Sequence, residues 1–246
     1  MCTFRTSKLL VRLSYSYKNK NTKDDFKMEI KNCPYCDSKR LYILQNNYKK
    51  CSTCNRKFSI RKIEIDFRII EFFCNNISAN RCSKILKLNY RTVQNRYMLF
   101  RKLIANFLEN EHYNSINDNS SYEEFYYFTN REKKNKKRSL YNAINILGFY
   151  SNKKVFTLLM PKLPRHNTVE DDKEFEKYLK WHRIYSQYSY STPLNVFWKY
   201  LEENLKKYKG VNENNFFYYL KECEFKFTYL QNKQIEILKT IFYKYQ

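Results

Sequence analysis

The chain has 246 residues, with 47 lysines and arginines against 24 aspartates and glutamates, and this charge of +23 attracts polyanions such as DNA, RNA or anionic lipid. It contains only 2 glycines, so it lacks a glycine-rich phosphate loop, which excludes P-loop nucleotidases and Rossmann dinucleotide binders. No apolar run approaches the roughly 18 residues of a membrane span, and no long apolar signal region follows the N-terminus, so we expect a cytoplasmic protein without a membrane partner.

The positive charge is concentrated in the N-terminal half. Residues 1–110 contain 24 basic and 8 acidic side chains, whereas residues 111–246 contain 23 and 16. Because attraction to a polyanion follows the local excess of charge, we expect the N-terminal half to carry most of the polyanion contacts.

Cysteine spacing predicts a metal site early in the chain. Two pairs, Cys33-Pro-Tyr-Cys36 and Cys51-Ser-Thr-Cys54, are separated by fourteen residues. Each pair can form a tight turn with both thiolates on one side, and two such turns place four sulfurs around a tetrahedral Zn²⁺. The alternative is a disulfide framework, which a chain without a secretory signal does not favour. We therefore expect a structural zinc site.

The stretch around these pairs predicts a small zinc ribbon. Residues 41–44 and the region of Tyr48 are expected to form strand, turn and strand, with Phe58 packed against them. A ribbon of this size has little core, so the metal supplies much of its folding free energy. Its basic rim suits phosphate contact, although solvated charge gives the same pattern: Lys39, Arg40, Lys49, Lys50, Arg56 and Lys57.

Residues 60–110 predict three helices. Apolar residues at three- and four-residue steps from Ile63 to Cys74 indicate the first. Ser78 is the expected N-cap of a short amphipathic helix that ends at Leu86, and Asn89 is expected in the left-handed position of the turn that follows. Cys74, Cys82 and Cys223 are expected to be small core residues.

The third helix is predicted from Arg91 to about Leu108. A short helix, a tight turn and a helix that opens with polar residues is the helix-turn-helix pattern, whose second helix enters the major groove of DNA. Three side chains are expected to pack inward: Val93, Tyr97 and Phe100. The expected DNA contacts are Arg91, Thr92, Gln94, Asn95 and Arg96.

The C-terminal half predicts a mixed α/β region after a polar linker. A basic run at 131–138 is expected to be an exposed hairpin loop. Three antiparallel strands followed by mixed elements suit a ribonuclease-H-like layer. The expected elements are strands at 122–128, 141–150, 154–160 and 184–190, and helices at 169–180, 193–210, 213–229 and 233–243.

The order of cysteine pairs, helix pair and acidic three-stranded region resembles the ISXO-type insertion-sequence transposases, a family of DDE-class enzymes. The most specific matching stretches are Leu194-Asn195-Val196-Phe197-Trp198, Tyr208-Lys209-Gly210-Val211 and residues 216–227. The segment 153–156 is similar to the third strand of the family. The resemblance covers about residues 30–230 and implies DNA transposition by metal-dependent phosphoryl transfer.

The resemblance also implies a catalytic site in which three acidic or amide ligands hold two Mg²⁺ ions. The first acidic position of the family falls on Glu123, where the family has aspartate. Its final motif falls on Thr192 and Asn195, where the family has asparagine and glutamate. The second aspartate has no match on a strand between Pro161 and Ser191. The catalytic residues carried over, Glu123 and Asn195, therefore form a degenerate set that would need Mg²⁺ only if it functions.

The expected fold is multi-domain α+β, and the expected function is DNA binding by a transposase-family protein with impaired catalysis. Its partner would be double-stranded DNA, such as terminal inverted repeats, bound as a homo-oligomer. One alternative is a zinc-ribbon and helix-turn-helix transcriptional regulator without enzymatic activity. A second is an active transposase whose ligands are Glu123, Asn195 and one of Asp171 and Asp172. A third is an RNA-binding protein, which the core-like spacing of the aromatic residues disfavours. The expected segments are a basic segment (1–28), a zinc ribbon (29–59), a helix-turn-helix domain (60–110), a linker (111–121) and a shortened ribonuclease-H-like domain with C-terminal helices (122–246).

Overall fold

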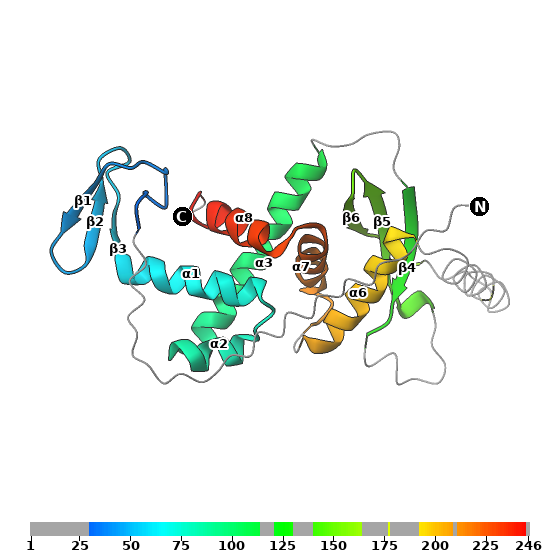
Figure 1. Cartoon of the computed structure of the whole chain (residues 1–246). Coiled ribbons are helices and arrows are strands. Elements are labelled where there is room, and N and C mark those ends of the chain that lie inside the picture. The colour runs from blue at the N-terminus through cyan, green and yellow to red at the C-terminus, as the bar shows by residue number, and fades with distance from the viewer. Residues whose placement is uncertain are drawn as a thin grey trace, which may run out of the picture. The chain divides into compact units, whose positions relative to one another are not determined.

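The structure is a computed structural model that describes residues 30–113, 121–129, 140–163, 177, 192–208 and 211–244. These residues form a mixed α/β fold with six α-helices and two antiparallel three-stranded sheets (Figure 1). The chain separates into two units, residues 1–30 and 31–246, and every contact described below lies within the second unit. In the described ranges no helix has the length and apolarity of a membrane-spanning segment.

The first sheet contains β1 (Leu41–Leu44), β2 (Tyr48–Cys51) and β3 (Lys57–Ser59) in that order. The turn between β1 and β2 has positive φ angles of 60° and 59° at Asn46 and Asn47, a conformation that asparagine tolerates better than most residues. Phe58 is buried, so the predicted hairpin and its packing residue are confirmed. The sheet leads directly into the first helix.

Three helices follow, α1 (Ile60–Cys74), α2 (Ala79–Leu86) and α3 (Tyr90–Tyr113). As predicted, Ser78 caps α2, because its Oγ accepts a hydrogen bond of 3.3 Å from the backbone N–H of Arg81. The third helix extends five residues beyond the predicted end at Leu108. Residues 111–113 of the expected linker are therefore helical, and residues 114–120 lie outside the described ranges.

The turn between α2 and α3 corrects one prediction. Lys87, not Asn89, adopts the left-handed conformation, with φ 52° and ψ 42°. The backbone N–H of Leu88 then donates to the carbonyl of Ser83 at 2.9 Å, as in a Schellman motif. Asn89 is instead used at the start of α3, where its Oδ1 accepts a hydrogen bond of 2.8 Å from the N–H of Arg91.

The core of this region joins α1 and α3 to α8 (Gln231–Lys244). Val93 and Tyr97 are buried as predicted, and the ring of Phe100 lies 5.5 Å from Phe73 and 5.4 Å from Phe242. The three cysteines predicted to be core residues are buried: Cys74, Cys82 and Cys223.

The second sheet contains β4 (Ser121–Tyr127), β5 (Ile144–Ser151) and β6 (Lys154–Leu159), paired antiparallel in chain order. This confirms the three predicted strands, with one change of boundary. The second strand begins at Ile144 because Leu140–Asn142 form a 3₁₀ turn that buries Tyr141.

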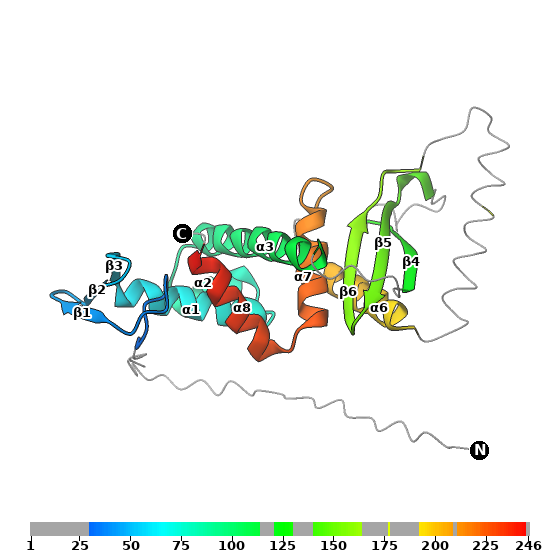
Figure 2. The same ribbon diagram turned by 90° about the horizontal axis from the view of Figure 1, so that it is seen from above.

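Helices α6 (Pro193–Lys207) and α7 (Phe216–Thr228) pack against this sheet, and α7 lies between β6 and α3 (Figure 2). The ring of Trp198 stacks on Phe125 with their centroids 4.7 Å apart. Gly148 makes this approach possible, because a Cβ there would lie 2.5 Å from the Trp198 ring. One of the two glycines therefore has a packing role.

Two boundaries of α6 and α7 differ from their predictions by three residues each, and α8 begins two residues before its predicted start. Helix α6 ends at Lys207, short of Gly210, because Tyr208 is extended and its hydroxyl donates to Glu222 at 2.9 Å. Helix α7 begins at Phe216, after a turn in which Asn212 and Asn215 hydrogen-bond each other's backbone N–H. The basic run, the helix at 169–180, the strand at 184–190 and Gly210 fall outside the described ranges, except that Lys177 is helical.

Charged side chains of α7 are buried on both of its sides. Glu222 accepts hydrogen bonds of 2.6 Å from Arg101 of α3 and from Lys226. On the other side, Glu224 accepts from the N–H and the hydroxyl of Thr157 in β6, at 3.0 and 2.6 Å. These interactions fix α7 between the helical region and the second sheet.

Candidate metal centre and nucleic-acid surface

The four paired cysteines come together at one end of the first sheet. Their sulfur atoms all lie within 4.8 Å of one another. The Sγ atoms of Cys33 and Cys54 are 3.7 Å apart, and those of Cys36 and Cys51 are 3.5 Å apart. A tetrahedron of sulfurs about 2.3 Å from a central Zn²⁺ has edges of about 3.8 Å. The cluster therefore has the dimensions of a tetrathiolate metal site.

The two cysteine turns share one backbone geometry. The N–H of Cys33 donates to the carbonyl five residues later at 2.9 Å, and the N–H of Cys51 does the same at 3.0 Å. The residue after the second cysteine of each pair has positive φ, 57° at Asp37 and 56° at Asn55. Aspartate and asparagine adopt this conformation at low cost, so the local sequence favours both turns.

The pKa values of two cysteine thiols in the cluster are shifted in opposite directions. The backbone N–H of Cys54, with a smaller contribution from that of Thr53, lowers the pKa of the Cys51 thiol to about 6. Burial raises the pKa of Cys33 to about 12. A divalent ion that prefers thiolates would displace the remaining thiol protons and bind all four sulfurs. The donor set fits a metal ion such as zinc.

Aromatic packing connects the cysteine turns to the helices. The ring of Tyr35, between the first two cysteines, lies 6.0 Å from Phe58 and 5.5 Å from Tyr243 of α8. The guanidinium of Arg56 lies 4.7 Å from the centre of the Tyr35 ring. A change in the conformation of the cysteine turns would therefore alter the packing of Tyr35 against Tyr243 of α8.

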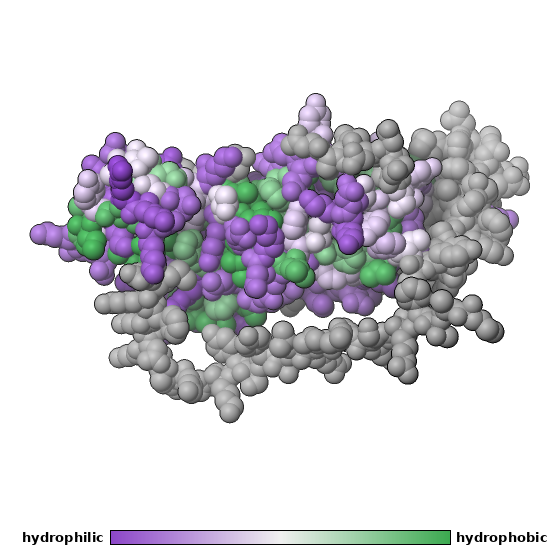
Figure 3. Space-filling model, turned by 45° about the horizontal axis from the view of Figure 1, so that its top comes forward, coloured by the Kyte–Doolittle hydropathy of each residue, from purple (hydrophilic) through white to green (hydrophobic). Residues whose placement is uncertain are grey.

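The exposed surface of the first sheet is basic and partly apolar. Ile43 is 82% exposed and Tyr42 is 62% exposed, and neither was identified as a surface contact from the sequence. At the β1–β3 end, on the left of Figure 3, hydrophilic residues (purple) surround smaller hydrophobic areas (green). Five of the six predicted rim residues are exposed and Lys49 is half-buried: Lys39, Arg40, Lys50, Arg56 and Lys57.

The first turns of α3 present most of the predicted DNA-contacting side chains to solvent. Arg91, Thr92, Gln94 and Asn95 are exposed. Arg96 is half-buried and forms an ion pair of 3.4 Å with the buried Asp66 of α1. This fifth residue is therefore engaged within the protein, which the sequence spacing alone did not reveal.

Glu123 and Asn195, the two catalytic residues carried over from the resemblance, share Thr192 as a hydrogen-bond partner, Asn195 through its backbone. The hydroxyl of Thr192 accepts from the N–H of Asn195 at 3.0 Å and donates to Glu123 at 3.4 Å. Burial raises the pKa of Glu123, which the Thr192 hydroxyl opposes. In the described ranges, the only group of three or more His, Cys, Asp or Glu side chains close enough to share a metal is the cysteine cluster. Asp171 and Asp172 lie outside those ranges.

Comparisons with protein-family models, with curated proteins and with solved structures found no match to this chain. The resemblance to insertion-sequence transposases therefore depends on the sequence motifs alone. What the geometry adds is a cluster of four cysteines that could hold a metal ion, next to a surface rich in lysine and arginine. Neither feature assigns a reaction.

Proposed function

We propose that this chain is a DNA-binding protein of the insertion-sequence transposase type, with an incomplete catalytic site. In this proposal the cysteine cluster is a structural zinc ribbon, and α2 and α3 form a helix-turn-helix. The observation that carries the proposal is that a tetrathiolate-sized cluster is followed, after α1, by a helix pair whose second member begins with exposed polar side chains.

The two parts would contact DNA in different ways. Arg91 and Gln94, on exposed positions of the first turns of α3, are side-chain types that read guanine and adenine in the major groove. The lysines and arginines of the first sheet would contact phosphates, which adds affinity but no sequence preference. Arg96 would support this surface through Asp66 and would not contact a base itself.

The C-terminal region would be the remnant of a ribonuclease-H-like layer. Three antiparallel strands covered by α6 are compatible with that interpretation. The Thr192 hydroxyl bonds both Glu123 and the backbone N–H of Asn195, but the Asn195 side chain is neutral, and in the described ranges Glu123 belongs to no group of three or more His, Cys, Asp or Glu side chains that could share a metal. Two-metal phosphoryl transfer needs a fuller ligand set, so we expect strand transfer to be weak, and Mg²⁺ to matter only if activity remains.

A binding measurement on the full chain tests the DNA part of this proposal. Fluorescence anisotropy with a linear duplex should give an affinity that falls steeply between low and moderate salt. Replacing Arg91 and Gln94 with alanine should weaken binding by about tenfold or more. Arg68→Ala removes one exposed charge of α1 outside this surface and is the matched control. Equal loss in both variants, or no binding at low salt, would refute the proposed contact surface.

A second candidate function is a transcriptional regulator with the same DNA-binding parts and no enzymatic activity. The incomplete ligand set around Glu123 favours it. Footprinting separates the two, because a transposase relative should protect terminal inverted repeats as a homo-oligomer, whereas a regulator should protect one promoter-like site. Mg²⁺-dependent joining of duplex ends that is abolished by Glu123→Gln would show instead an active enzyme.

A further inference from the structure

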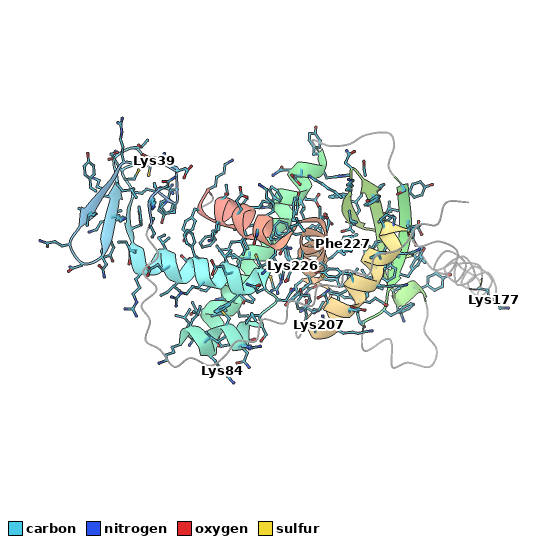
Figure 4. The ribbon with its side chains drawn as sticks, viewed as in Figure 1. Lys39, Lys84, Lys177, Lys207, Lys226 and Phe227 are labelled. Carbon is cyan, nitrogen blue, oxygen red and sulfur yellow. The ribbon has the colours of Figure 1, made fainter. Side chains whose placement is uncertain are left out.

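A pocket of about 310 Å³ lies where the α1–α2 turn, α3, the end of α6 and α7 meet. It is distinct from the cysteine cluster and from the exposed side of α3, although Tyr90 and Gln94 of the first turns of α3 contribute to its wall. Lys226 of α7 lies near the centre of the described elements, and Lys207 lies at the end of α6 (Figure 4). Its volume is at the lower end for small-molecule sites.

Arg101 is the central polar group of this pocket. Arg101 is 7% exposed, and its Nε–H donates a hydrogen bond of 2.6 Å to the Glu222 carboxylate. The guanidinium carbon lies 4.1 Å from the centre of the Tyr219 ring. An arginine has five N–H donors, and in the described part of the chain no residue accepts a hydrogen bond from either Nη atom. Arg101 therefore offers two free nitrogens to an occupant.

The charges around Arg101 leave a positive excess. Glu222 is the one acidic residue in the pocket wall, and it is shared between Arg101 and Lys226. Lys226 has its three donors engaged, with Glu222, the carbonyl of Phe73 and the side chain of Asn76. Arg101 and Lys226 therefore share one carboxylate, and the positive charge left over favours an added negative charge beside the Arg101 nitrogens.

The N-terminus of α2 provides a second feature of the same sign. Ser78, Ala79 and Asn80 line the pocket. Ser78 accepts from the N–H of Arg81, whereas the N–H groups of the first helical turn have no acceptor within the helix. The positive end of a helix dipole attracts anions. The buried arginine and this helix end therefore favour the same kind of ligand.

We infer that this pocket binds a small aromatic anion, a planar ring that carries a carboxylate or phosphate. The anionic group would pair with the Nη atoms of Arg101. The ring would pack among the aromatic side chains of the wall: Phe73, Tyr90, Tyr97, Tyr208 and Tyr219. This inference does not depend on DNA binding.

Calorimetric titration of the full chain with phenyl phosphate, benzoate and inorganic phosphate tests the inference. Phenyl phosphate or benzoate should bind saturably, and whichever of the two binds more tightly identifies the anionic group. Inorganic phosphate should bind at least tenfold more weakly, because it lacks the ring. Inorganic phosphate as the tightest ligand would refute the aromatic part of the inference, and no saturable binding of the three would refute all of it.

Two variants test the position of the site. Arg101→Met should weaken binding about tenfold or more, and Glu222 keeps Lys226 as its partner in that variant. Ala79→Leu should also weaken binding because it fills the pocket without touching the ion pairs. Arg68→Met, which removes an exposed arginine of α1 outside the pocket, should bind as the unmodified chain does. Unchanged affinity in Ala79→Leu, with its fold checked by circular dichroism, would overturn the assignment.

Discussion

Asp37 and Asn55 occupy equivalent positions after the second cysteine of each pair, both with positive φ. Their short polar side chains allow each chain segment to reverse and bring its two sulfurs to one side. Each cysteine turn is therefore formed by a local segment of six residues, 33–38 or 51–56, and is closed by a hydrogen bond within that segment. Only the meeting of the two turns depends on the sheet between them.

Removal of a single cysteine sulfur tests the metal site at the level of one residue. Cys51→Ser should abolish stoichiometric metal binding, because a serine hydroxyl is a poor ligand for a thiolate-preferring ion. Metal content of the purified variant, measured by mass spectrometry, gives the result. Cys82→Ala, in the core of α2, should retain its metal. Full metal occupancy in Cys51→Ser would show that the ion is held elsewhere.

Gly148 gives a second residue-scale prediction. Gly148→Ala should reduce the free energy of unfolding by about 1–3 kcal/mol, because the added methyl group collides with the Trp198 ring. Thermal denaturation measures the change, and Trp198→Leu should lessen the penalty of the alanine in the double variant. An alanine variant as stable as the unmodified chain would mean that α6 packs further from β5 than described.

At the scale of elements, α7 connects the two parts of the described fold through buried charge. Arg101 and Glu222 are 121 residues apart in sequence and form one ion pair. On the other side, Glu224 of α7 accepts hydrogen bonds from Thr157 of β6 and lies 3.2 Å from the buried ammonium of Lys221. Polar residues in a helix pattern normally indicate a solvated face, so no sequence rule identifies these side chains as buried.

Glu224 should make stability depend on pH. Burial raises its pKa from 4.5 to about 7 in the folded protein. Between these values the folded state holds a proton that the unfolded state has lost, so the free energy of unfolding falls as pH rises through this window. The free energy of unfolding should therefore fall between pH 5 and pH 8, and Glu224→Gln should reduce this fall by a contribution on the order of 2 kcal/mol.

Urea denaturation at the two pH values measures this effect. Glu236→Gln, which alters an exposed pair with Lys233, should leave the pH dependence as it is. Parallel pH profiles of the Glu224→Gln variant and the unmodified chain would contradict a raised pKa of Glu224 in the folded protein.

At the scale of the whole molecule, local signals predicted more than distant ones. The cysteine cluster, the Ser78 cap and the three strands of the second sheet were predicted from local patterns, and the structure contains each of them. The left-handed residue of the α2–α3 turn was assigned to Asn89, although its side chain is needed to cap α3. The pairing of Arg96 with Asp66 and the pocket around Arg101 arise from packing between distant helices, which spacing does not encode.

The cysteine cluster also has consequences for the whole molecule. Tyr35 links it to Tyr243 of α8, and α8 contributes Phe242 to the core that holds α1 and α3. Loss of the metal should therefore disorder the first sheet and loosen α8, with a smaller effect on the second sheet. The proposed DNA surface would lose both its phosphate contacts and the support of α3.

Metal analysis of the purified full chain, before and after treatment with a strong chelator, tests whether a bound metal ion organises the first sheet. We expect one zinc ion per chain, and Co²⁺ in its place should give the absorption of a tetrahedral tetrathiolate site. Chelation should remove the ion and the ordered signal of the first sheet together, because binding and folding of such a small sheet are coupled. A metal-free chain with unchanged structure would contradict the account.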